Sequence, residues 1–307
     1  MMELIPPGTK IDFIGKQKIA IAISLIIILA GIASIVAKGG VRYGIDFAGG
    51  TMIQVAFKTP ANADQIRSAL EGSVEGTPII QETLGGKGEF IIQLENVTND
   101  LEGVEKLMGE TLGKAFGKDN VSLSQAQMVG PRAGAEMRQK ALIAIIVSWL
   151  AILAYVWWRF ELHWGIGAIV ALIHDVSVTV AFFSFLDKQF DIQIIAALLT
   201  IIGYSINDTV VIFDRVRENI KKFGTRYTIE EYFNISINET LGRTILTAAT
   251  VFLSVLALFF FGGPVIHDFS LALLIGSIAG TYSTVYIASP VVLYVQNRWR
   301  GRDVSKF

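Results

Sequence analysis

The chain has 307 residues, of which 52% are hydrophobic and 17% charged, and its formal net charge is −1. This apolar share, with a mean hydropathy of +0.53, excludes an ordinary soluble domain and indicates an integral membrane protein. The sequence contains no cysteine, which excludes disulfides, thiol catalysis and thiolate metal sites.

Six runs are apolar and long enough to cross a hydrocarbon core of about 30 Å, which takes roughly 20 helical residues. They are residues 19–37, 141–158, 165–186, 192–213, 244–261 and 271–295. The first run follows three lysines, as the core of a secretory signal would. It is longer than such a core and no small-residue cleavage site follows it, so we expect it to remain as a span.

Basic residues are distributed unevenly among the segments that join the spans. If the N-terminus is cytoplasmic, the segments on that side hold most of the Lys and Arg residues near the spans, whereas the two short outer loops hold only Lys188. The positive-inside rule therefore predicts that residues 1–18 and 296–307 are cytoplasmic. The long segment after the first span is then exported.

The exported segment, residues 38–140, has the composition of a small soluble domain. Its apolar patterns predict the order β-α-β-β-α-β. The predicted elements are strands 51–57, 78–84, 89–94 and 121–129, a hairpin turn at 85–88, a helix over 62–71 with the cap pair Asn62 and Gln65, and a helix opened by Asn99 with Glu102. This order is typical of a ferredoxin-like α+β domain.

The expected fold is therefore an α-helical membrane bundle of six transmembrane helices with an α+β domain inserted between helices 1 and 2. Helices 2–6 occupy residues 141–295. No repeat relates the two halves of the chain, although transporters often carry one. If the fold needs two pseudo-symmetric halves, the other half is a separate chain.

The predicted cytoplasmic loop 214–243 carries a helical signal of its own. Thr228 and Glu231 have capping-box spacing, and apolar residues recur every four positions after them. The pattern predicts a short amphipathic helix. It is equally compatible with a helix on the inner membrane surface and with one packed on the bundle.

The fourth span carries a carboxylate, Asp208, inside its apolar run. A charge at the centre of a membrane helix costs about 2.5–3.5 kcal/mol, so such residues usually face a bundle interior or water. Asp208 is close to the cytoplasmic end of the span, at a depth of only about 7–8 Å. An interfacial carboxylate that reaches the headgroups is the alternative, but the small and polar residues around Asp208 favour a buried polar site.

Arg243, at the start of the fifth span, is a candidate partner for Asp208. Thr247, Thr250 and Ser254 follow Arg243 on one helical stripe. An arginine and a hydroxyl stripe facing an aspartate fit a hydrated path for protons. The alternative is that each hydroxyl bonds its own backbone and Arg243 is an ordinary anchor at the membrane surface.

His174 and Asp175 lie near the middle of the third span. Such a pair can relay protons, because histidine titrates near neutral pH. A structural pair that satisfies neighbouring hydroxyls such as Ser177 is an equally good interpretation. A metal site is disfavoured, since His163 and His267 fall in loops predicted on opposite sides of the membrane.

Two further patterns complete the survey. In the sixth span, Gly276, Gly280 and Thr284 have small-xxx-small spacing, which predicts close helix packing. No phosphate-cradling glycine loop, Ser-His-Asp set or dinucleotide fingerprint occurs. We therefore expect no enzyme activity and no cofactor, with protons as the coupling ion, since the membrane potential supplies about 2.3 kcal/mol per charge per 100 mV.

Several runs resemble a known family. Residues 201–219, IIGYSINDTVVIFDRVREN, resemble the fourth-span signature of the SecD/SecF protein-export family, and residues 44–51, GIDFAGGT, look like its DFxGG element. Residues 129–132 and 238–244 are similar to the family's entries to the second and fifth spans. The motif positions matched are Asp46, Phe47, Gly49, Gly50, Gly203 and Asn207.

The resemblance implies a half-size member of the resistance-nodulation-division superfamily in the inner membrane. It implies pairing with SecD, association with the SecYEG channel, and use of the proton gradient to draw secretory precursor proteins outward. In the family, a fourth-span Asp and a fifth-span Arg are tied to proton passage, and Asp208 and Arg243 match them. It implies no role for His174 or Asp175, and nucleic acid is not an expected partner.

Two other functions remain as alternatives. A proton-coupled exporter subunit for small molecules or lipids would use the same carboxylate, but the single outer domain and the missing second half count against it. A membrane-embedded enzyme is disfavoured because the sequence offers no nucleophile or metal set.

Overall fold

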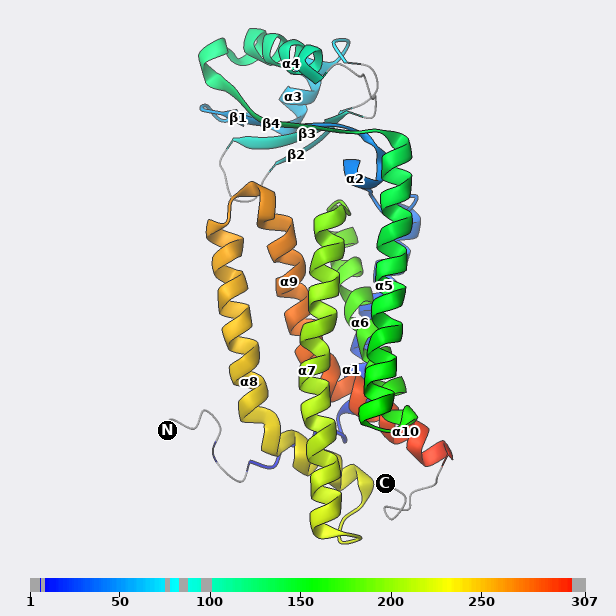
Figure 1. Ribbon diagram of the computed structural model, residues 1–307. Helices are drawn as coiled ribbons and strands as arrows, with labels where there is room; N and C mark the ends of the chain where they lie inside the picture. The colour runs from blue at the N-terminus through cyan, green and yellow to red at the C-terminus, as the bar shows by residue number, and fades with distance from the viewer. Residues whose placement is uncertain (1–5, 7–8, 75–77, 83–87, 95–100, 300–307) are drawn as a thin grey trace.

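A computed structural model of the chain describes residues 6, 9–74, 78–82, 88–94 and 101–299. Among them, six helical segments are long and apolar enough to cross a membrane. They form a bundle with a small domain at one end, here called the domain end, and the opposite end is the foot (Figure 1). The segments are α1 (Gln17–Ala37), α5 (Pro131–Arg159), α6 (Leu162–Phe185), α7 (Ile192–Phe223), α8 (Ile229–Phe261), and α9 (Pro264–Ser283), which continues through a π-helical turn, η2 (Thr284–Ala288), into α10 (Ser289–Trp299).

Several of these helices extend beyond the apolar runs that predict them. Residues 131–140, which hydropathy alone places in the outer domain, are the first turns of α5, with Pro131 at its first helical position. At the foot, α7 continues past the predicted end at residue 213. Hydropathy finds the apolar part of a helix, whereas the polar turns that leave the membrane carry no such signal.

The outer domain has the predicted order of elements. It contains β1 (Gly50–Phe57), α3 (Ala63–Leu70), β2 (Ile79–Glu82), β3 (Glu89–Leu94), α4 (Leu101–Phe116) and β4 (Val121–Val129). The antiparallel sheet has the order β2-β3-β1-β4. Helices α3 and α4 cover the face that points away from the bundle (Figure 1), and the ferredoxin-like prediction is confirmed.

One of the predicted local signals in the outer domain is confirmed. Asn62 and Gln65 form the predicted capping box at the start of α3. The hairpin turn, residues 85–87, and the cap residue Asn99 lie outside the described residues. A short helix that hydropathy does not predict, α2 (Ile45–Ala48), precedes β1 and belongs to the DFxGG element.

Helices α7 and α9 pack in register along the small residues of α9. A Cβ atom on Gly276 would lie 2.1 Å from Ile201 Cδ1, and one on Gly280 would lie 3.1 Å from Ser205 Cβ. One turn further, the hydroxyls of Thr209 and Thr284 are 3.1 Å apart. The packing interpretation of the small-xxx-small spacing is confirmed.

Gly276→Ala is expected to lower the stability of the bundle by about 1–3 kcal/mol, because the new methyl group overlaps the side chain of Ile201. The measurement is thermal unfolding in mild detergent. Ile201→Ala in the same chain should recover part of the loss, since it empties the space that the methyl group needs. Gly242→Ala is the control, because a Cβ there meets no atom within 4 Å. Equal midpoints for all variants would contradict the packing.

The helix predicted in the cytoplasmic loop 214–243 lies at the foot, where its contacts distinguish the two interpretations. Thr228 and Glu231 form the predicted capping box, but the helix they open is continuous with the fifth span as α8. Ile229, Phe233 and Ile237 are buried in one cluster with residues of α7. The first part of α8 runs across the foot before the helix turns upward (Figure 1). The helix is therefore packed on the bundle.

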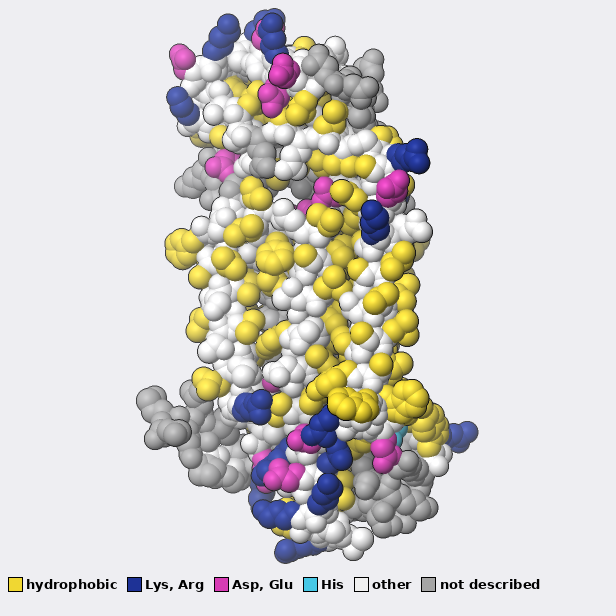
Figure 2. All heavy atoms as spheres, in the orientation of Figure 1, with side chains coloured by type: hydrophobic (Ala, Val, Ile, Leu, Met, Phe, Trp, Pro, Cys, Tyr) yellow, Lys and Arg dark blue, Asp and Glu magenta, His cyan; other side chains and the backbone are white. Residues whose placement is uncertain are grey.

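The surface agrees with a membrane-spanning bundle. Figure 2 shows hydrophobic side chains around the middle of the molecule and charged side chains gathered at the foot and on the outer domain. At the foot, Arg159 pairs with Asp214 and Arg215 pairs with both Glu218 and Glu239. The charges are thus placed where a bilayer of about 30 Å would leave them in water.

Candidate functional site

Asp208 lies inside the bundle, with 2% of its surface exposed. Helix α7 turns Ser205 and Thr209 inward with it, whereas Gly203 and Asn207 are exposed on the outer side of the helix. Burial of the carboxyl contradicts the alternative in which it reaches the headgroups.

The carboxyl of Asp208 has fewer hydrogen bonds than a buried carboxyl usually forms. The hydroxyl of Thr247 is 3.5 Å from Oδ1, but the same hydroxyl has closer contacts, at 3.0 Å, with the carbonyls of Arg243 and Thr244. Oδ2 is buried and has no hydrogen-bond partner among the described residues. An unpaired buried oxygen costs about 1–3 kcal/mol, so this carboxyl gains by binding a proton or by meeting a donor.

Arg243 is exposed, and it forms no ion pair or hydrogen bond with Asp208, both residues being described. Thr250 and Ser254 each donate to a backbone carbonyl one turn back. In this conformation the hydroxyls therefore follow the self-bonding interpretation. The pairing of Asp208 with Arg243 and the hydrated path remain predictions.

Polar groups are nevertheless exposed on the sides of α7 and α8. Asn207 of α7 and Arg243, Thr250 and Ser254 of α8 all lie on the surface of the bundle. Polar side chains exposed to lipid are costly, so membrane proteins usually bury them against protein or line water with them. This face therefore has the character of an interface with another membrane protein.

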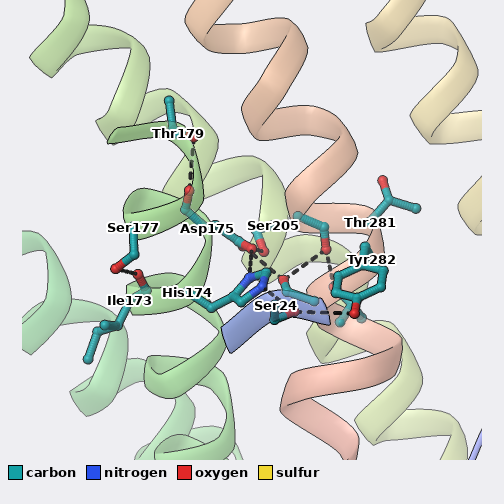
Figure 3. A network of polar contacts seen from close by, with 12 residues as sticks. Ser24, Ile173, His174, Asp175, Ser177, Thr179, Ser205, Thr281 and Tyr282 are labelled. Carbon is teal, nitrogen blue, oxygen red and sulfur yellow. Dashed lines mark hydrogen bonds and ion pairs between the residues drawn. The ribbon is translucent and has the colours of Figure 1, made fainter. Parts of the chain in front are cut away.

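His174 and Asp175 form the centre of a second polar cluster, seen in Figure 3. Asp175 is fully buried and accepts hydrogen bonds on Oδ2 from Ser205, at 2.7 Å, and from Ser283, at 2.9 Å. Its Oδ1 is 3.0 Å from His174 Nδ1. On the other side, His174 Nε2 is 2.9 Å from Ser24 Oγ in α1. The cluster thus joins α1, α6, α7 and α9.

The hydrogen bonds of this cluster fix the position of one proton. Tyr282 donates to the carbonyl of Ala20, and Ser24 donates to Tyr282. Ser24 therefore accepts from His174 Nε2, because its own hydrogen is already used. The contact of 3.0 Å between His174 Nδ1 and Asp175 Oδ1 completes the chain of polar groups from α1 to α6.

The structure supports the structural interpretation of the His174–Asp175 pair, with different hydroxyls from the one predicted. Ser177 donates to the carbonyl of Ile173 and points away from the cluster (Figure 3). Within the described part of the chain, no hydrogen bond or ion pair joins the pair to the Asp208 side chain. A relay role for the pair remains a prediction. Among the described residues, no three His, Asp or Glu side chains gather as metal ligands.

A third group of contacts lies at the domain end, where α7 begins. Asp191 caps α7, accepting from Ile194 N at 2.9 Å. Asp46 of α2 caps the same helix, accepting from Ile192 N at 3.0 Å. Burial, together with the charges of Asp46 and Asp268, raises the pKa of Asp191 to about 6, against the lowering effect of the cap hydrogen bond.

Asp191→Asn is expected to remove a pH dependence from the start of α7. Because the pKa of Asp191 is raised from 3.8 to about 6 in the folded protein, its contribution to stability is greatest below pH 3.8 and is lost as the pH rises through 6. Asparagine caps a helix about as well as aspartate but does not titrate. Amide hydrogen exchange at the start of α7, compared at pH 5 and pH 7.5 after correction for intrinsic rates, should therefore change in the wild type only.

The remaining motif positions serve packing at the same place. Phe47 is 2% exposed. A Cβ atom on Gly49 would lie 2.9 Å from Pro131 Cα, and one on Gly50 would lie 2.4 Å from the carbonyl oxygen of Leu94. Both glycines are therefore needed for close approach of backbone segments.

Sequence reasoning missed several of these polar groups. Ser24 is an isolated hydroxyl in α1, and Ser283 and Asp191 match no motif considered. The available signal was slight, since a serine in a membrane helix most often bonds its own backbone. Only contacts between helices give Ser24 and Ser283 a role, whereas Asp191 caps the helix that it precedes.

Comparison with known proteins gives consistent matches. The family described as "Protein export membrane protein SecD/SecF, C-terminal" matches residues 109–298, and the SecD/SecF GG motif matches residues 34–61. The protein translocase subunit SecF of Desulfurispirillum indicum is 39% identical over 300 residues, covering 96% of this chain and 93% of the relative. That of Thermodesulfovibrio yellowstonii is 42% identical over 289 residues, covering 93% and 94%.

Solved structures match over the whole fold. The crystal structure of SecDF from Thermus thermophilus, a translocon-associated membrane protein, superposes with a TM-score of 0.84 at 35% identity and covers 95% of this chain. A SecDF structure in a super-membrane-facing form gives a TM-score of 0.71. This chain spans only 39% and 41% of those longer chains.

Proposed function

The chain belongs to the SecD/SecF family of protein-export membrane proteins, and from this premise we propose that it acts as the SecF subunit of protein translocation. The observation that carries the proposal is the match to SecF subunits over nearly the full length of both chains. The resemblance in residues 201–219 and 44–51 is thereby confirmed. A transport role without catalysis or cofactor fits the names of these relatives.

The proposed partner is SecD, and the complex acts on secretory precursor proteins at the SecYEG channel. The solved SecDF chains contain this fold as about two-fifths of their length, which supports a second half supplied by another chain. The exposed polar groups on α7 and α8, among them Asn207 and Thr250, offer a face for that half. The SecDF of Thermus thermophilus is called translocon-associated, which supports the SecYEG assignment.

The proposed location is the inner membrane, with the foot in the cytoplasm and the outer domain outside. Basic side chains support this orientation, because Lys and Arg residues concentrate at the foot around α7 and the start of α8 (Figure 2). Membrane lipid surrounds the remaining helices.

Protons are the proposed coupling ion, with Asp208 as the group that binds and releases them. Its buried carboxyl has an unpartnered oxygen, and Thr247 is within reach. Arg243, which forms no ion pair or hydrogen bond with Asp208 in this conformation, would approach the carboxylate once the proton leaves. The hydrogen bonds around His174 and Asp175 are proposed to hold α1, α6, α7 and α9 together as one unit.

The proposal is tested by complementation. Cells depleted of their own SecF receive this chain together with its SecD, and the export rate of a secretory precursor is measured by pulse-labelling. We expect restored export and recovery of SecD when the tagged chain is purified in mild detergent. Correct insertion without rescue of export would overturn the proposal. Resistance to small toxic compounds without rescue of export would support an exporter instead.

A further inference from the structure

The segment of residues 42–50, which contains the DFxGG sequence, connects the outer domain to the bundle, and the proposed function gives it no role. Three separate parts of the protein contact it. On the bundle side, Gly44 N donates to the carbonyl of Phe190 at 2.7 Å, and Phe190 N donates to the carbonyl of Arg42 at 2.8 Å. The side chain of Asp46 then caps α7 at Ile192.

The same element is also packed against helix α5 and strand β3. A Cβ on Gly134, in the first turns of α5, would lie 2.9 Å from the carbonyl oxygen of Phe47. Gly50 begins β1 directly against the end of β3 at Leu94. The side chains of Gln93 in β3 and Gln189 before α7 are hydrogen-bonded and buried. We call this set of contacts, between residues 42–50 and their neighbours in α5, β3 and 187–192, the outer joint.

The covalent link from α1 cannot set the position of the outer domain by itself. After α1, Gly39 and Gly40 have φ angles of +78° and +131°, and a Cβ on either would meet no atom within 4 Å. The N–H groups of Gly39 and Gly40 donate to the carbonyls of Val36 and Ile35 at the end of α1, and Lys38 and Arg42 pair with Asp187. The link is therefore tied to the bundle and not to the outer domain. The position of the domain is therefore decided by the outer joint, which Figure 1 shows beside α2 and the top of α5.

Helix α7 connects the outer joint to the carboxyl at the other end of the span. It is one continuous helix from Ile192 to Phe223. Asp208 lies 16 residues after Ile192, which is roughly 24 Å along the axis. A helix packed on its neighbours moves as a rigid element, so a shift at Asp208 reaches Ile192.

We propose that Asp46 is the positioning residue through which a displacement of α7 is transmitted to the outer domain. The inference rests on the proposed function and adds the mechanical connection to it. Asp46 does not touch the transported proton. It holds the start of α7 against the DFxGG element, so that the outer domain follows a movement of α7.

The first test separates transmission from proton passage. Asp46→Ala removes the cap and is expected to lower precursor export about fivefold, while proton conductance through the complex stays at the wild-type level. Asp46→Asn keeps an oxygen that accepts from Ile192 N and is expected to restore export. Asp64→Ala, which removes an exposed carboxylate of the outer domain, is the control and should export normally.

The second test replaces the hydrogen bond between Asp46 and Ile192 by a disulfide at neighbouring positions. The chain has no cysteine, and a Cβ on Gly44 would lie 3.2 Å from Asp191 Cβ, close to the separation in disulfides. In the Asp46→Ala background, Gly44→Cys with Asp191→Cys is expected to restore export when oxidised and to lose it again in reductant. The reduced protein is its own control.

Three results would overturn the inference. They are normal export by Asp46→Ala, loss of proton conductance together with export in Asp46→Ala, and failure of the oxidised pair to restore export although the disulfide has formed. Failure of the proposed function is distinguishable, because the wild-type chain would then give no rescue of export in the same cells.

Discussion

Asp208→Asn is expected to lower proton-dependent export about tenfold or more, with unchanged amounts of protein in the membrane. The amide has nearly the shape of the carboxyl and fits the same buried site, but it does not bind or release a proton. It also removes the charge that would attract Arg243. The measurements are the export rate of a secretory precursor, the proton conductance of the membrane and the protein level by immunoblot.

Asp214→Asn is the matched control for Asp208. Asp214 lies on the same helix, but it is exposed at the foot and pairs with Arg159 at 2.8 Å. Exposed ion pairs contribute little to stability, so export should stay near the wild-type rate. Normal export by Asp208→Asn at a normal protein level would show that Asp208 is not the coupling carboxyl.

Asp175→Ala is expected to destabilise the bundle by about 3 kcal/mol or more. The substitution leaves the hydroxyl of Ser205 and the Nδ1 of His174 buried without the acceptor that they share. It also leaves a cavity where α6, α7 and α9 meet. The measurement is the midpoint temperature of unfolding in mild detergent, determined from the loss of monodisperse protein on heating.

Two variants define what the Asp175 result means. Ser177→Ala, on the same helix, removes a hydroxyl that bonds only the carbonyl of Ile173, and its midpoint should match the wild type. Asp175→Asn keeps one oxygen that accepts from Ser205 and Ser283, so its midpoint should lie between those of the wild type and Asp175→Ala. A wild-type midpoint for Asp175→Ala would contradict the role of the cluster in joining the helices.

Local patterns predicted much of the fold, because they depend on a few neighbouring residues. The capping pairs Asn62–Gln65 and Thr228–Glu231 form as their spacing predicts. The spacing of Gly276 and Gly280 predicted close packing, although it did not identify α7 as the neighbour. Hydropathy did not predict the polar helical turns that lie outside the apolar runs. Residues 131–140, for example, are the first turns of α5 and not part of the outer domain.

The candidate site was predicted only in part, for the same reason. Asp208 is conspicuous as a charge in an apolar run, so the sequence indicates it without a structure. Its burial was not predictable, nor was its separation from Arg243, because both depend on how α7 and α8 are rotated against each other.

The sequence by itself determined the six spans, the ferredoxin-like insertion, the family and the carboxyl at Asp208. The tertiary structure alone decided that Ser24 meets His174, that Ser205 meets Asp175, and that Asp46 caps α7. The physical reason is the range of the interactions. Hydropathy and capping act within one or two helical turns, whereas these hydrogen bonds join residues far apart in the chain, brought together only by the packing of helices.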